Sequence, residues 1–351
     1  MKAYVIKDIG KMEYEEVKVP QIGVSDVLVE VAATGICGSD IPRIYSGGAY
    51  FYPLISGHEF AGKIVGVGSK ADLGLKGKRV SVFPLIPCNE CDQCRQKKYE
   101  LCQKYGYLGS RQNGGFAEYV LAPAWNVMEL PEDIDYEVGA LIEPMCVAVH
   151  AIRHIEITKE DRILVFGAGS IGLFVTMFLL EAGYENVYVI GKKDIQRRKA
   201  IELGLNEENY CDSSTEDVDI WIKDHTDDHG ADILFECVGD NKTINESIRN
   251  AAYAAKVVLV GNPRADVCFD KKAYSTILRR QLTIKGTWNS SFTRDEDDDW
   301  HYVVERLAHK RIRPEILITH RYDFDKLAEG FDMIHRKSEE YVKVMGIVRG
   351  R

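Results

Sequence analysis

The stretch Ile163-Leu164-Val165-Phe166-Gly167-Ala168-Gly169-Ser170-Ile171-Gly172 decides the fold of this chain. Its four apolar residues predict a buried strand, which runs directly into the pattern G-x-G-x-x-G and then into an apolar helix at Leu173–Leu180. Gly167 permits a tight turn, Gly169 lets a pyrophosphate approach the backbone, and Gly172 lets the helix pack on the strand. Because the helix N-terminus also offers N–H donors to phosphates, the stretch predicts a dinucleotide site.

From about residue 148 onward, buried strands alternate with helical stretches, which is typical of βαβ units on a parallel sheet. The flanking sequence is different, because residues 1–80 are rich in β-like runs and the chain closes on another at Val342–Val348. We therefore predict an α/β protein in which a doubly wound Rossmann domain, residues 148–287, is inserted into a β-rich catalytic domain, residues 1–147 and 288–351. The predicted Rossmann strands are Ile163–Phe166, Val187–Ile190, Ile233–Phe235 and Val257–Val260.

The end of the second Rossmann strand bears on the choice of cofactor. An acid that holds the ribose 2′-OH is expected there, and Gly191 occupies its place. Glycine leaves room for a 2′-phosphate, and nearby positive charge would bind it, so the sequence favours NADP over NAD. Two alternatives stay open: Asp194 turns inward and serves NAD, or the basic residues are solvated charges. The basic residues are Lys192, Lys193, Arg197 and Arg198.

Length and composition exclude several classes of protein. The chain has 351 residues, 45% of them hydrophobic and 28% charged, which suits two ordinary globular domains. Its formal net charge of −9 argues against binding to nucleic acid or to an anionic membrane surface, since both need a basic face. The longest apolar run, Ile171–Leu180, is about half the length of a membrane helix. The N-terminus predicts a strand rather than a signal peptide, so we expect a cytoplasmic protein.

Four of the nine cysteines lie close together, at Cys88, Cys91, Cys94 and Cys102. Without a secretion signal, clustered cysteines bind metal more often than they form disulfides. Four thiolates satisfy tetrahedral Zn²⁺ and leave no position for water, so we predict a structural zinc lobe at about residues 85–105. The alternative is a group of free or redox-active cysteines.

Three separated segments hold the remaining candidates for catalysis: Cys37-Gly38-Ser39-Asp40, Gly57-His58-Glu59 and Glu143-Pro144. Taken singly, Cys37 suits a buried apolar position, His58 a turn and Glu143 a helix start. Together with the cysteine lobe, the nucleotide turn and the stretch Gly114-Gly115-Phe116-Ala117-Glu118-Tyr119, they resemble the medium-chain zinc dehydrogenase family along the whole chain, and Glu143-Pro144 resembles its polyol branch.

The resemblance implies a GroES-like fold for the catalytic domain and a catalytic zinc held by Cys37, His58 and a carboxylate. Both Glu59 and Glu143 are candidates for that carboxylate. Together with the structural zinc of the cysteine lobe, this catalytic zinc gives two expected zinc ions per subunit, one catalytic and one structural. One thiolate, one imidazole and one carboxylate also suit Zn²⁺ as a ligand set and leave an open position.

The same resemblance implies the roles of neighbouring residues. Ser39 matches the hydroxyl of a proton relay, and Asp40 matches the acid that accepts the second N–H of His58. Arg43 lies in the segment that lines the substrate cleft and Arg111 in a glycine-flanked loop, and arginine matches phosphate geometry. The expected cofactor-binding set is Gly167, Gly169, Ser170, Ile171, Gly172, Gly191, Lys192, Lys193, Val238 and Gly261.

The residues and the resemblance together predict an enzyme that reversibly oxidises a secondary hydroxyl of a polyol phosphate with NAD(P). The resemblance also implies a homodimer or homotetramer. A rival is an unphosphorylated polyol dehydrogenase of the sorbitol (L-iditol) or butanediol type. A non-catalytic binding protein on the same fold would have lost Cys37, His58 or the carboxylates, and none is lost. A zinc-free quinone reductase would lack the ligand set.

Overall fold

The computed structural model describes residues 1–348, which form two compact units. The first unit comprises Met1–Cys146, Ser290–Lys310 and the chain from Ile318 onward. The second comprises Val147–Asn289 together with Arg311–Leu317, a short return that the sequence did not predict. Within residues 1–348, every helix is too short or too polar to cross a lipid bilayer.

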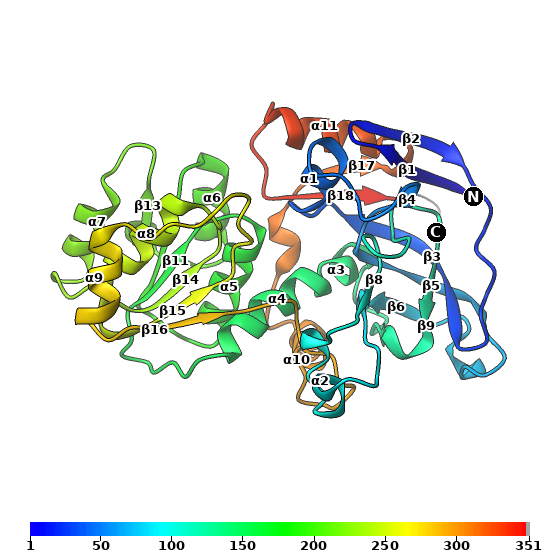
Figure 1. Cartoon of the computed structure of the whole chain (residues 1–351), viewed down its shortest axis with the longest axis horizontal. Helices are drawn as coiled ribbons and strands as arrows, with labels where there is room; N and C mark the ends of the chain where they lie inside the picture. The colour runs from blue at the N-terminus through cyan, green and yellow to red at the C-terminus, as the bar shows by residue number, and fades with distance from the viewer. Residues whose placement is uncertain (349–351) are drawn as a thin grey trace. The chain divides into compact units, whose positions relative to one another are not determined.

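The second unit is built on a six-stranded, fully parallel sheet in the order β13-β12-β11-β14-β15-β16 (Figure 1). Apolar residues on both faces of the strands force helices to cover both, and Val218, Trp221 and Ile222 of helix α7 pack with Leu164 and Phe166 in one cluster. The predicted doubly wound sheet is therefore confirmed. Its elements are β11 (Ile163–Phe166), α5 (Ser170–Glu181), β12 (Val187–Gly191), α6 (Asp194–Glu202), β13 (Tyr210–Asp212), α7 (Val218–His225), β14 (Ala231–Glu236), α8 (Asn241–Arg249), β15 (Ala251–Leu259), α9 (Lys271–Arg279) and β16 (Thr283–Gly286).

The first unit is β-rich, as predicted. Its main sheet runs β10-β6-β5-β3-β18-β17, with β9 also paired to the long strand β3. A second sheet has the order β2-β1-β4, and β7 pairs with β8. Its strands are β1 (Lys2–Asp8), β2 (Lys11–Glu16), β3 (Asp26–Gly35), β4 (Leu54–Ile55), β5 (Glu59–Val67), β6 (Arg79–Val82), β7 (Leu85–Ile86), β8 (Gly106–Tyr107), β9 (Tyr119–Pro123), β10 (Val127–Glu129), β17 (Ile318–Asp323) and β18 (Lys343–Ile347).

Helices of this unit pack against its core. Helix α11 contributes Phe331 and Ile334 to a cluster that also contains Tyr4 and Phe116. The helices are α1 (Asp40–Tyr45), α2 (Asp92–Arg95), α3 (Tyr136–Ala140), α10 (Asp299–Ala308) and α11 (Leu327–Arg336), and α4 (Ile142–Arg153) begins in this unit and ends in the other.

Candidate active site

The end of strand β3 and the start of strand β5 bring three predicted ligands together. In the antiparallel register Gly35 lies opposite Glu59, so Cys37, just beyond the end of β3, comes next to His58 and Glu59. One ligand atom from each of these three residues lies within 4.8 Å of the others. Thiolate, imidazole and carboxylate are the donors that Zn²⁺ takes in catalytic sites, so the donor set fits the metal.

The electrostatics of Cys37 also fit a cation. Burial, together with the charges of Glu59 and Asp40, raises the pKa of its thiol to about 11. The Ser39 hydroxyl donates to the Cys37 Sγ at 3.3 Å, and the Ser39 backbone N–H lies at 3.5 Å. A bound divalent cation would stabilise the thiolate and offset the surrounding negative charge.

Asp40 is fully buried and organises the turn around Cys37. Its Oδ2 accepts the Cys37 backbone N–H at 3.0 Å, and its Oδ1 accepts from Arg43 and from the Ser56 hydroxyl, each at 2.7 Å. The expected hydrogen bond to His58 is not made, because the His58 Nδ1 lies 3.9 Å from Oδ1. The Asp40 Oδ1 already accepts hydrogen bonds from Arg43 and Ser56. Asp40 is therefore a charged neighbour of the imidazole rather than its hydrogen-bond acceptor.

Glu143 lies in the first turn of helix α4 and is almost completely buried. Its Oε1 accepts from the Tyr107 hydroxyl at 3.2 Å, and the Tyr107 ring packs against His58 with the ring centroids 5.8 Å apart. Burial raises the pKa of Glu143 to about 8, and Glu59 and Cys37 contribute. In the described structure Glu143 is not one of the three residues with mutually close ligand atoms, so it stands beside the cluster.

Lys343 is a member of this site that the sequence reading missed. It lies on strand β18, is 2% exposed, and its Nζ bonds Glu59 Oε2 and the Ile36 carbonyl oxygen. The available signal was a lysine inside the apolar run Val342–Met345, which ordinarily avoids charge.

The four clustered cysteines form a compact sulfur site in the same unit. Their Sγ atoms lie within 4.8 Å of one another, including Cys91–Cys94 at 3.5 Å and Cys88–Cys94 at 3.9 Å. A tetrahedron of sulfurs about 2.3 Å from zinc has edges of about 3.8 Å, so the spacing fits the metal. Backbone N–H groups of Cys94 and Gln103 lower the pKa of Cys91 to about 6, which favours the thiolate.

The predicted dinucleotide turn has the geometry that its glycines permit. Gly167 has φ +97°, and a Cβ at Gly172 would lie 1.8 Å from the Gly167 carbonyl oxygen. A Cβ at Gly169 would meet nothing within 4 Å, which leaves its face open for a phosphate to approach. Ser170 and Ile171 then begin helix α5.

The neighbouring turn after strand β14 lies against the first. A Cβ at Gly167 would be 2.5 Å from Val238 Cγ2. The buried carboxylate of Glu236 accepts the backbone N–H groups of Val238 and Gly239, each at 3.0 Å, and the Thr243 hydroxyl at 2.7 Å. Gly261 packs on the same turn, where a Cβ would lie 2.1 Å from the Gly239 nitrogen.

A tyrosine explains the glycine at the end of strand β12. An added Cβ at Gly191 would lie 1.9 Å from the Tyr210 hydroxyl, and Tyr210 comes from the neighbouring strand β13. No acidic side chain fits there while Tyr210 keeps this position. Asp194 does not replace the acid, because its exposed carboxylate pairs with Arg198 at 3.1 Å.

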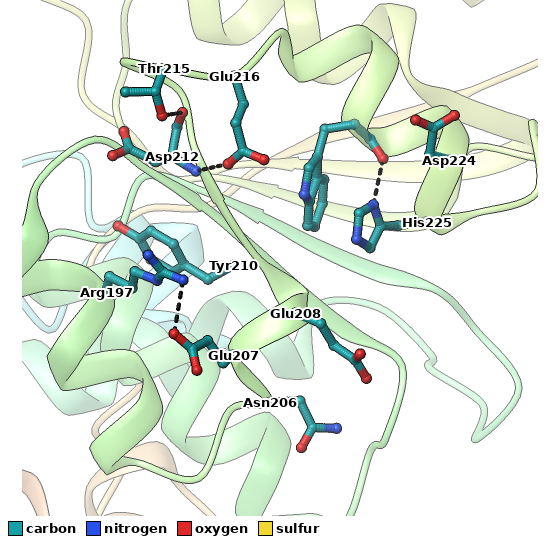
Figure 2. Close-up of a pocket in the computed structure, with 11 residues that line it drawn as sticks. Arg197, Asn206, Glu207, Glu208, Tyr210, Asp212, Thr215, Glu216, Asp224 and His225 are labelled. Atoms are coloured by element: carbon teal, nitrogen blue, oxygen red, sulfur yellow. Dashed lines mark hydrogen bonds and ion pairs between the residues drawn. The ribbon is translucent and has the colours of Figure 1, made fainter.

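A cavity of about 1000 Å³ lies beside strand β13 (Figure 2). Its lining includes five acidic residues, and Arg197 pairs there with Glu207 at 2.9 Å. It contains none of the predicted catalytic residues. Arg197 and Arg198 both have carboxylate partners, and Lys192 and Lys193 directly follow Gly191 at the end of β12.

The two predicted substrate arginines differ in their surroundings. Arg43 is 16% exposed at its side chain, and one nitrogen already bonds Asp40 and Ser56. Arg111 is exposed, with its guanidinium carbon 4.0 Å from the Tyr105 ring centroid and 5.1 Å from that of Tyr50.

Comparison with known proteins agrees with this architecture. Residues 23–132 match the alcohol dehydrogenase GroES-like domain, and residues 170–309 match the zinc-binding dehydrogenase domain. The chain is 32% identical over 340 residues to galactitol 1-phosphate 5-dehydrogenase of Escherichia coli (strain K12), covering 96% of this chain and 97% of the relative. It is 29% identical to the L-galactonate-5-dehydrogenase of the same strain, covering 98% of each chain.

Solved structures give the same result. The crystal structure of galactitol-1-phosphate dehydrogenase from Escherichia coli superposes with a TM-score of 0.91 at 32% identity, covering 99% of this chain and 100% of the other. A zinc-binding dehydrogenase from Sinorhizobium meliloti 1021 bound to NADP gives 0.89 at 29% identity, covering 99% and 98%. The chain therefore belongs to the zinc-dependent medium-chain dehydrogenases, oxidoreductases of the alcohol dehydrogenase family.

Proposed function

We propose that this protein oxidises a secondary hydroxyl of a polyol phosphate, reversibly and with NADP as the favoured cofactor. The observation that carries the proposal is the cluster of Cys37, His58 and Glu59 with the Ser39 hydroxyl 3.3 Å from the Cys37 sulfur. These three residues offer donors that suit zinc, and the Ser39 hydroxyl beside them is the group that we propose for proton transfer.

Cys37 and His58 would hold the catalytic zinc, with Glu59 or Glu143 as the third protein ligand. Zinc held by these residues would supply a Lewis acid for the substrate hydroxyl, and a bound nicotinamide would supply the hydride acceptor. Ser39 would accept the hydroxyl proton. Asp40 fixes the backbone of Cys37, so the sulfur keeps its direction toward the metal.

The four cysteines Cys88, Cys91, Cys94 and Cys102 would hold the second zinc. This set offers four thiolates and no open position, so its role is to fold the loop that carries it. The enzyme would then contain two zinc ions per subunit.

Arg111 supports the choice of a phosphorylated substrate. In an acidic protein a phosphate dianion needs a cation that is not already neutralised, and Arg111 has no carboxylate partner among residues 1–348. Tyr105, whose ring holds Arg111, packs against Tyr107, which in turn packs against His58. Arg43 is the second candidate, with part of its guanidinium engaged by Asp40. The relative named for galactitol 1-phosphate is in keeping with this choice.

The preference for NADP is supported by Gly191, which puts no carboxylate at the end of β12, and by Lys192 and Lys193 immediately after it. The related structure bound to NADP is in keeping with it.

A homodimer or homotetramer is also part of the proposal. Strand β16 is an edge strand, and edge strands invite pairing with another chain. Apolar side chains on the adjoining segment are exposed, which adds to the case. They are Val267, Phe269, Tyr274 and Leu278.

One assay tests the proposed function. Purified enzyme is offered several hexitol phosphates and their parent polyols, each with NAD and with NADP. We expect the phosphate esters to give the higher kcat/KM and NADP to give the lower KM. Equal kcat/KM for esters and free polyols would instead support the unphosphorylated polyol dehydrogenase.

A further inference from the structure

We infer that the rings of Tyr50 and Tyr105 hold the guanidinium of Arg111 at a fixed distance from the metal ligands. The enzyme then selects its substrate by the spacing between the phosphate and the hydroxyl that is oxidised. This selection rests on the proposed function, because it needs a phosphorylated polyol whose reacting hydroxyl lies at the zinc.

The guanidinium of Arg111 lies over two aromatic rings. Its central carbon is 4.0 Å from the Tyr105 ring centroid and 5.1 Å from that of Tyr50, and both distances are within the range of cation–π attraction. One guanidinium nitrogen also donates to the Tyr105 carbonyl oxygen at 3.2 Å. Within residues 1–348 the group makes no further hydrogen bond or ion pair, so its other N–H groups can form the paired bonds that arginine makes with phosphate.

The ring of Tyr50 is held in place by its own loop. The Ala49 backbone N–H donates to the Tyr52 hydroxyl at 3.1 Å. Gly48, with φ +76°, leaves room for that hydroxyl, because an added Cβ would lie 2.8 Å from it. Tyr50 itself is 73% exposed, so packing in the core does not explain its position, and its ring contact is with Arg111.

The loop that carries Arg111 is packed on the backbone of the metal site. Gly109 has φ +81°, and a Cβ there would lie 2.5 Å from the carbonyl oxygen of Gly57, the residue before His58. The buried Ser56 hydroxyl lies 2.8 Å from the Gly109 carbonyl oxygen. Two backbone segments this close cannot shift independently, because no side chain separates them.

Tyr107 makes a second connection between the same two groups. Its carbonyl oxygen accepts the Arg111 backbone N–H at 2.9 Å, and its ring packs edge-on against His58 with the centroids 5.8 Å apart. The Tyr105 ring packs against the Tyr107 ring at 6.3 Å. The fold therefore sets the separation between the Arg111 guanidinium and the His58 imidazole, whether or not a substrate is bound.

A fixed separation selects the position of oxidation. A metal held by His58 would fix the reacting oxygen at one end of the substrate, and Arg111 would fix the phosphate at the other. A carbon chain that is one carbon too short or too long displaces the reacting hydroxyl by about 1 Å, and a misplacement of that size can lower the rate about 100-fold. A free polyol lacks the phosphate, so it is not subject to this selection.

The test compares tetritol, pentitol and hexitol phosphates with their parent polyols, all with the same configuration at the reacting carbon. Steady-state assays give kcat/KM, and calorimetry in the presence of NADPH, which cannot accept a hydride, gives the Kd of each ester. We expect wild type to favour one chain length of ester by at least about tenfold in kcat/KM, and to differ by less than about threefold among the free polyols.

Tyr50→Leu and Tyr105→Leu should each raise the Kd of the favoured ester by about 2- to 5-fold, and the double variant by about tenfold. The double variant should also lose most of the preference for chain length, while kcat/KM for the parent polyol stays within about twofold. Tyr50→Phe and Tyr105→Phe keep the rings and should keep the wild-type values. Tyr253→Leu is the matched control, because Tyr253 is 74% exposed and lies 5.3 Å from the guanidinium of Arg280, and it should change neither quantity.

The outcomes separate the two levels. A wild-type enzyme that prefers no ester to its parent polyol would refute the proposed function and the inference with it. A preference for esters that Tyr50→Leu leaves unchanged, in Kd and in chain length, would overturn the inference alone, even if Tyr105→Leu does not fold. An equal loss on esters and free polyols would also overturn it, because the rings would then support the fold rather than the phosphate.

Discussion

The hydroxyl of Tyr210 lies 1.9 Å from the position that a Cβ atom on Gly191 would take. The two residues come from adjacent parallel strands, β12 and β13, so a side chain on one strand determines which residue the other accepts. Because the end of β12 is where dinucleotide folds select between NAD and NADP, this contact bears on the cofactor.

Gly191→Asp alone should therefore not change the cofactor preference from NADP to NAD. The added side chain meets the Tyr210 ring, and overpacking of this kind costs about 1–3 kcal/mol, so we expect a lower Tm and weaker binding of both cofactors. Combined with Tyr210→Ala, the same aspartate has room, and the preference should move toward NAD. The measurements are thermal unfolding and calorimetric binding of NAD and NADP, with Tyr210→Ala alone as the control. An unchanged Tm in Gly191→Asp would contradict the steric argument.

Arg111→Ala should separate phosphorylated from free polyols. Losing a charge-assisted contact worth about 1.5–3 kcal/mol lowers kcat/KM for a hexitol phosphate by roughly 10- to 100-fold, while kcat/KM for the parent polyol stays within about twofold. Arg95→Ala, at an exposed arginine paired with Asp92, is the matched control and should affect neither substrate. An equal loss on both substrates would show that Arg111 supports the fold rather than the phosphate. The same comparison for Arg43→Ala tests the second arginine.

Cys91→Ser should remove the structural zinc and leave the catalytic one. We expect the zinc content to fall from two ions to one per chain, with a lower Tm, because metal binding and folding of this loop are coupled. Cys268→Ser, at an exposed cysteine outside both clusters, should keep both ions and the wild-type Tm. A Cys91→Ser protein that retains two zinc ions would rule out the four-cysteine site.

Glu236 should make stability depend on pH. Burial raises the pKa of its carboxyl above the usual 4.5, although three hydrogen bonds oppose the shift. The folded state therefore binds the proton at a higher pH than the unfolded state does. Its contribution is least favourable above the folded pKa and improves as pH falls through it toward 4.5. Urea unfolding at pH 7 and pH 5 should show that the stability of wild type relative to Glu236→Gln increases at the lower pH; a decrease would contradict the sign.

Features that depend on neighbours in the sequence could be predicted from it. The Gly167–Gly172 turn and the Cys88–Cys102 loop each lie within one short segment. Residue type and spacing are therefore sufficient to predict them. The parallel sheet was also predictable, because each strand of a βαβ unit is a short apolar run. Only the family resemblance predicted that Cys37, His58 and Glu143 share one site. These residues lie far apart in the chain, so they form no short motif with a recognisable spacing.

The remaining features depend on strand register and on side-chain competition. Lys343 lies 284 residues from Glu59 in sequence, and only the order β18-β3-β5 brings them together. Tyr210 reaches Gly191 because β13 joins the sheet edge in one particular register. The bond expected between Asp40 and His58 was wrong for a related reason, because Arg43 and Ser56 compete for the same oxygen.

Strand β18, which carries Lys343, is synthesised after all the other residues of the site. A nascent chain that has emerged from the ribosome only as far as helix α11 already carries every cysteine and histidine of the metal sites, but the carboxylate of Glu59 has no ammonium beside it. Because Lys343 lies in the last strand of the described chain, the Glu59 carboxylate gains its buried counter-charge only when almost the whole chain has been synthesised.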